Sequence, residues 1–80
     1  MRLTEVRQAL AATADSVGYS AKSDCFVAKR SYFYRQGMTA ERLALSVTAA
    51  MPVEIKVMAT TDNWHAWPAD SFFEVRFRVR

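Results

Sequence analysis

The last eight residues of the chain alternate between apolar and charged side chains. The two interleaved sets are Phe73, Val75, Phe77 and Val79, and Glu74, Arg76, Arg78 and Arg80. Because successive side chains of a strand point to opposite faces, this period of two predicts a strand with one buried face and one charged face. Other elements can then cover only one side of the sheet that contains it.

Two further strands are predicted upstream. Residues 25–35 are dense in aromatic and β-branched side chains and contain neither glycine nor proline. Residues 53–59 alternate, with apolar side chains at every odd position. Two helices are expected as well. Residues 5–17 carry apolar side chains at helical spacing before Gly18, and Thr39 can cap a helix whose apolar stripe stops before Pro52.

The predicted order is therefore α-β-α-β-β in a single α+β domain that spans residues 1–80. A right-handed crossover makes the first two strands parallel, so we expect a three-stranded mixed sheet with two helices packed on one face. The last strand lies either at an edge or between the other two, where all its neighbours would be antiparallel. We favour the middle position.

Composition narrows the class of protein. Apolar residues make up 51% of 80 residues, which predicts a globular core. No apolar run approaches the roughly 20 residues that span a bilayer, and the first five residues lack a signal peptide's apolar stretch. We therefore expect a soluble, cytoplasmic protein. One cysteine and one histidine are too few for a disulfide framework or a cysteine-based zinc cluster, and no cofactor is predicted.

The uncovered sheet face is predicted to be basic. Arg76 and Arg78 lie there by alternation in the last strand. If Cys25, Val27 and Phe33 of the first strand face the core, three more side chains of that strand face outward. These are Arg30, Tyr32 and Tyr34. Arginine and tyrosine on an open sheet can hold single-stranded nucleic acid, because rings stack on bases and guanidinium groups neutralise phosphates. The same residue types anchor protein interfaces, and a plain solvated face is the third alternative.

Both tryptophans and the only histidine fall in one long loop between residues 61 and 71. Hairpin loops usually have about two to five residues, so this length indicates a role. Trp64 and Trp67 either fold back to close the core or form an exposed tip that, with His65, contacts a partner. A metal site built from His65 and the two nearby aspartates is disfavoured, because it has too few convergent ligands.

No catalytic constellation is predicted. Cys25 and His65 are the one nucleophile and base worth pairing, but Cys25 begins a strand at the end away from the loop of His65. A buried, unreactive cysteine is the better interpretation. We therefore expect a protein that is not an enzyme.

Three short stretches carry a resemblance. They are RSYFYRQG at residues 30–37, DNW at 62–64 and FFEVRF at 72–77. Over roughly residues 25 to 80, the chain resembles small proteins of unassigned function encoded by tailed bacteriophages. The resemblance implies a compact accessory protein that acts by binding a host or viral partner in the host cytoplasm. It assigns no role to individual residues.

The sequence thus predicts a small binding protein that contacts another protein, or a second copy of itself, through the open sheet face and the tryptophan loop. The alternative is a single-strand nucleic-acid binder that uses the arginine and tyrosine face. No membrane partner is expected.

Overall fold

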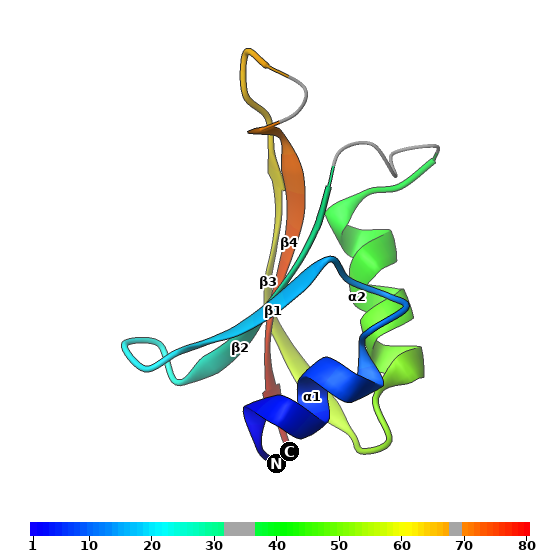
Figure 1. Cartoon of the computed structure of the whole chain (residues 1–80), viewed down its shortest axis with the longest axis vertical. Helices are drawn as coiled ribbons and strands as arrows, with labels where there is room; N and C mark the ends of the chain where they lie inside the picture. The colour runs from blue at the N-terminus through cyan, green and yellow to red at the C-terminus, as the bar shows by residue number, and fades with distance from the viewer. Residues whose placement is uncertain (32–36, 68–69) are drawn as a thin grey trace.

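The computed structural model describes residues 1–31, 37–67 and 70–80. The bounds of its elements are α1 Leu3–Ala9, β1 Ser16–Ser20, β2 Cys25–Ser31, α2 Ala40–Ala50, β3 Ile55–Asn63 and β4 Phe72–Val79. The described strands form one sheet in the order β1-β2-β4-β3, and every neighbouring pair is antiparallel (Figure 1). The α+β class is confirmed. The predicted number of three strands is one short, because β1 is added. The sheet is antiparallel and not mixed, because β4 takes the favoured middle position, where both of its neighbours are antiparallel to it.

The additional strand, β1, takes up the last two residues of the predicted helix, 16 and 17, and the three residues that follow it. Helix α1 ends at Ala9, and Ser16–Ser20 pair with β2 across a turn at residues 21–24. A short helix is only marginally stable in water, so the hydrogen-bonded pairing with β2 decides the conformation of this segment. The helical spacing nevertheless identifies buried side chains, since all four apolar positions belong to the core. They are Val6, Leu10, Ala14 and Val17.

Strand β4 lies between β2 and β3, the middle position that the sequence favours. Strand β3 continues to Asn63, four residues past the predicted end at 59, and this shortens the tryptophan loop to residues 64–71. The register of β3 shifts between Val57 and Ala59, which leaves Met58 as an extra residue in a β-bulge. The predicted end of the first strand, at residues 32–35, lies outside the described residues.

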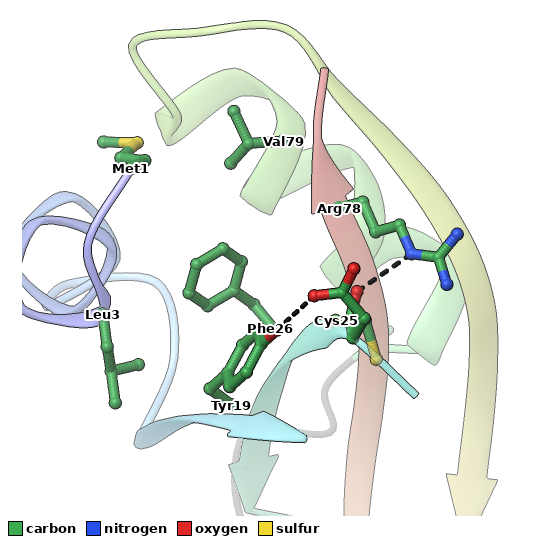
Figure 2. Close-up of a pocket in the computed structure, with 8 residues that line it drawn as sticks. Met1, Leu3, Tyr19, Cys25, Phe26, Arg78 and Val79 are labelled. Atoms are coloured by element: carbon green, nitrogen blue, oxygen red, sulfur yellow. Dashed lines mark hydrogen bonds between the residues drawn. The ribbon is translucent and has the colours of Figure 1, made fainter. Parts of the chain in front are cut away.

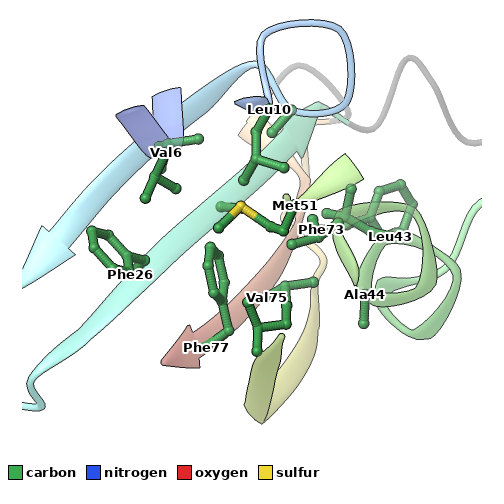
Figure 3. Close-up of a cluster of buried hydrophobic side chains, with 14 of the residues drawn as sticks. Val6, Leu10, Phe26, Leu43, Ala44, Met51, Phe73, Val75 and Phe77 are labelled. Atoms are coloured by element: carbon green, nitrogen blue, oxygen red, sulfur yellow. The ribbon is translucent and has the colours of Figure 1, made fainter. Parts of the chain in front are cut away.

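The core lies between the two helices and one face of the sheet (Figure 3). Phe73, Val75 and Phe77 of β4 are fully or almost fully buried. Val6 of α1 and Leu43 of α2 belong to the same cluster, so both helices cover the same face. The opposite face carries neither described helix.

Helix α2 agrees closely with the prediction. The Thr39 hydroxyl accepts a hydrogen bond from the amide of Arg42 at 3.1 Å. Asp62 of β3 accepts another from the amide of Ala40 at 2.8 Å. Two of the amides that a helix start leaves without a partner are therefore satisfied, and the second bond ties the helix to the sheet. The predicted apolar stripe is buried at every position, namely Ala40, Leu43, Ala44, Val47 and Met51.

The prediction that Arg30 of the first predicted strand, now β2, faces away from the core is wrong. Phe26 and Ala28 are buried on the helix-covered side, so Arg30 falls on that side by alternation. Its Nη1 donates to the carbonyl oxygens of Ala12 at 3.3 Å and Thr13 at 2.5 Å. Arg30 therefore fastens the turn between α1 and β1 to the sheet and is turned away from the open face.

We expect Arg30→Met to lower the free energy of unfolding by about 1.5 to 3 kcal/mol, because hydrogen bonds from a charged donor are lost. Denaturant titration followed by circular dichroism measures the change. Lys22→Met, which removes the same charge from an exposed turn, should change stability by less than about 0.5 kcal/mol. Equal losses in both variants would show that net charge, and not the Arg30 contacts, matters.

Candidate functional site

The sheet face opposite the helices, which we call the open face, is polar. The register of the four strands places mostly polar or small residues on it, among them Ser16, Gly18, Ser20, Val27, Lys29, Ser31, Lys56, Ala59, Thr61, Asn63, Glu74, Arg76 and Arg78, together with Cys25 and Phe72. Arg76 and Arg78 therefore lie where alternation predicts them. A shallow hollow of about 310 Å³ crosses β1, β2 and β4 on this face. Its floor includes Gly18, where an added Cβ would meet no atom within 4 Å.

An ion cluster occupies the middle of the open face. Glu74 is only 9% exposed, and its carboxylate lies 3.1 Å from Nε of Arg76 and 3.9 Å from Nζ of Lys29. The hydrogen bond and the negative charge of Glu74 raise the pKa of the Arg76 guanidinium above its usual value. Two of the basic groups on this face are therefore already partnered by an acid that the sequence analysis did not single out.

Of the other members of the predicted nucleic-acid set, Arg78 lies on this face and is engaged by the protein itself, and Arg30 does not lie on this face. Arg78 donates from Nε to the carbonyl of Asp24 and from Nη2 to that of Ser23, both at 2.9 Å, and so holds the β1–β2 turn. Arg30 lies on the other side of the sheet. Tyr32 and Tyr34 lie outside the described residues.

The described residues of the tryptophan loop, 64–67 and 70–71, lie at the end of the β3–β4 hairpin (Figure 1). Trp64 is 59% exposed and Trp67 is 73% exposed. Trp64 touches Phe73 edge to face, with ring centroids 5.9 Å apart. Of the two alternatives that the sequence leaves open, closure of the core and an exposed tip, the structure places both indoles in an exposed tip.

The base of this loop is held by two contacts. The amide of His65 donates to Oγ of Ser71 at 2.9 Å, and Ser71 is buried. The imidazole of His65 stacks on Phe72 at 6.1 Å between centroids, and the ammonium of Lys29 lies 4.8 Å from the centre of the same ring. Three of the predicted site residues, Trp64, His65 and Trp67, are thus brought together on one anchored loop.

A second hollow, of about 510 Å³, lies at the other end of the molecule, near the start of α1 and the end of β4 (Figure 2). Leu3, Phe26 and Val79 supply its apolar walls. The Tyr19 hydroxyl donates a hydrogen bond to the Asp24 carboxylate. This bond is the main cause that raises the pKa of Tyr19 above its ordinary value of 10.0.

The structure does not bring Cys25 and His65 together. Cys25 is buried at the start of β2, whereas His65 stacks on Phe72, which pairs with Ser31 at the far end of β2. Among residues 1–31, 37–67 and 70–80, no group of three or more His, Cys, Asp or Glu side chains is placed to hold a metal ion. No helix in this part of the chain combines the length and apolar character needed to cross a membrane.

We expect Asp24→Asn to lower the pKa of Tyr19 toward 10.0, because the charged acceptor of its hydroxyl is lost. Asn suits the positive φ of 49° at this position. Since the folded pKa is raised, the Tyr19 proton stabilises the fold below pH 10, and this contribution is lost as the pH rises through the folded value.

A titration of phenolate absorbance measures the shift, and Tyr19→Phe identifies which part of the curve belongs to Tyr19. Superimposable curves for the wild type and Asp24→Asn would contradict the assignment.

Comparisons with known proteins identify no relative of this chain. No protein-family model, no curated protein and no solved structure matches the chain.

Proposed function

We propose that this protein is a non-enzymatic binding protein that contacts another protein through its tryptophan loop, with Trp64, His65 and Trp67 as the contact residues. The observation that carries the proposal is the exposure of both indoles at the end of a hairpin. An indole buries a large apolar area when it enters a partner's pocket, and tryptophan is enriched among the residues that dominate interface energetics.

The anchored base of the loop supports the same function. The Ser71 hydrogen bond and the stacking of His65 on Phe72 hold the start and end of the loop together before any partner arrives. Holding the two ends of the loop together in advance reduces the conformational entropy that is lost on binding, which improves affinity. The resemblance to phage accessory proteins favours a host or viral protein as the partner.

The basic open face is the competing surface, and its contacts favour the protein partner over nucleic acid. Arg76 and Lys29 share Glu74, and Arg78 holds backbone carbonyls. A phosphate would have to compete with these contacts. In a titration against labelled single-stranded DNA and RNA, we expect only weak binding that disappears at physiological salt. Binding that survives that salt and prefers single strands would replace the tryptophan loop with the open face as the site.

The direct test places a photo-crosslinking residue at position 67 and irradiates the protein in an extract of the cells that make it. We expect a discrete adduct that excess unlabelled wild-type protein suppresses and that excess Trp67→Ala does not. The matched control carries the same photo-crosslinker at Leu45, which is 72% exposed on α2 and distant in sequence from the loop.

Stability separates a contact role from a structural one. Because its side chain is largely exposed, Trp67→Ala should change the free energy of unfolding by less than about 0.5 kcal/mol. Trp64→Ala loses the edge contact with Phe73 and should cost about 0.5 to 1.5 kcal/mol. Adducts of equal yield from positions 67 and 45, or full competition by Trp67→Ala, would refute the tryptophan loop as the contact.

A further inference from the structure

Strand β3 forms one edge of the sheet and is long and exposed. It pairs with β4, and no described strand lies along its other side. Seven of its nine residues are exposed, all but Ile55 and Asn63. An edge of this kind presents a row of backbone amides and carbonyls to which another strand can bind.

The opposite edge of the sheet is closed by contrast. Strand β1 has five residues, and α1 contacts it, as α2 contacts β3. Nε of Arg7, from that helix, donates to the carbonyl oxygen of Val17 at 2.8 Å. Short length, a covering helix and a charged side chain are the usual protections of an edge strand. On β3, the charge of Lys56 and the bulge at Met58 lie in its first half, which leaves residues 59–63 regular.

Exposed apolar side chains gather along this same edge. Val57 and Met58 lie on β3, Val53 precedes the strand and Trp64 follows it. The middle of the strand, residues 57–61, carries no charge. Lys56 stands near its start and Asp62 near its end.

We propose that β3 pairs with β3 of a second copy of this chain, antiparallel and about a two-fold axis near the middle of the strand. Antiparallel pairing about this axis keeps the two Lys56 side chains apart, and the two Asp62 side chains as well, whereas parallel pairing in register would place like charges together. The same arrangement brings Trp64 close to the partner's Val53. A two-fold axis closes the assembly as a dimer, because each edge is used once.

The charges argue for the edge over the open face as the surface of self-association. Two stacked open faces would set Lys29, Arg76 and Arg78 against their own copies, with Glu74 as the only acid on that face among the described residues. Like charges brought together in this way disfavour an interface. The β3 edge meets no such penalty.

This inference goes beyond the proposed function and does not depend on it. The dimer joins two sheets into one and places a tryptophan loop at each end of the shared pair of strands. Trp67 stays outside the contact and is left for the other protein. A dimer with two such loops would bind a partner with repeated sites more tightly than a single loop does.

Sedimentation velocity from low micromolar to near-millimolar concentration tests the dimer with the full chain. We expect a concentration-dependent shift from the mass of one chain to that of two. Met58→Lys, which puts two like charges near the axis, should raise the dissociation constant by about tenfold or more. Leu45→Lys introduces the same charge on α2, at a side chain that is 72% exposed where Met58 is 42% exposed, and should leave the dimer intact.

Hydrogen exchange provides a readout that needs no variant. Amides of residues 57–63 should gain protection as the concentration of the wild type rises, and those of β1 should not. A wild type that remains monomeric throughout, or a dimer that survives Met58→Lys with β3 amides unprotected, would overturn the inference. Either result leaves the crosslinking test at Trp67 unaffected, so the two ideas fail separately.

Discussion

The rest of the molecule depends on the packing of side chains against the buried face of β4. Phe73, Val75 and Phe77 are at most 2% exposed, and the strand that carries them has a hydrogen-bonded neighbour on each side. Truncating one buried phenylalanine typically costs about 3 to 5 kcal/mol, which is a large part of the roughly 5 to 15 kcal/mol that stabilises a small domain. Both helices reach this face, so one alternating strand organises the core.

The other face of β4 is charged as a direct consequence of that arrangement. With its apolar residues committed to the core, β4 presents Glu74, Arg76 and Arg78 on the open face. These groups pair with each other, with Lys29 and with the carbonyls of the β1–β2 turn. Because these charges are engaged in internal contacts, the face braces the β1–β2 hairpin and is less available as a polyanion site than its composition indicates.

Exposed apolar side chains follow β3 and the loop after it, from Val53 to Trp67, while Met1, Tyr19 and Leu45 are exposed elsewhere. Trp64 and Trp67 stand exposed on an anchored loop, and the edge strand β3 runs directly into it. In a chain of 80 residues, a single core cannot cover every apolar side chain. Where the uncovered ones lie together, they indicate contact with another molecule. The proposed contact loop and the proposed dimer edge are adjacent parts of this one surface.

The local sequence pattern was enough to predict β4 and α2 and their buried faces. Strict alternation in β4 and a capped apolar stripe in α2 each leave one low-energy arrangement. The pattern also identified Val6, Leu10, Ala14 and Val17 as core residues, and Arg76 and Arg78 as outward-facing.

Tertiary contacts decided the features that the local pattern left open. Ser16 and Val17 fit the end of a helical stripe as well as a strand, and only the partner strand β2 selects between them. Both faces of β2 mix apolar and polar side chains, so the face of Arg30 depends on which side Phe26 packs. Whether the indoles were core or surface likewise depended on how much of the core β4 and the helices filled without them. Such choices are set by packing between segments distant in sequence, which no local period records.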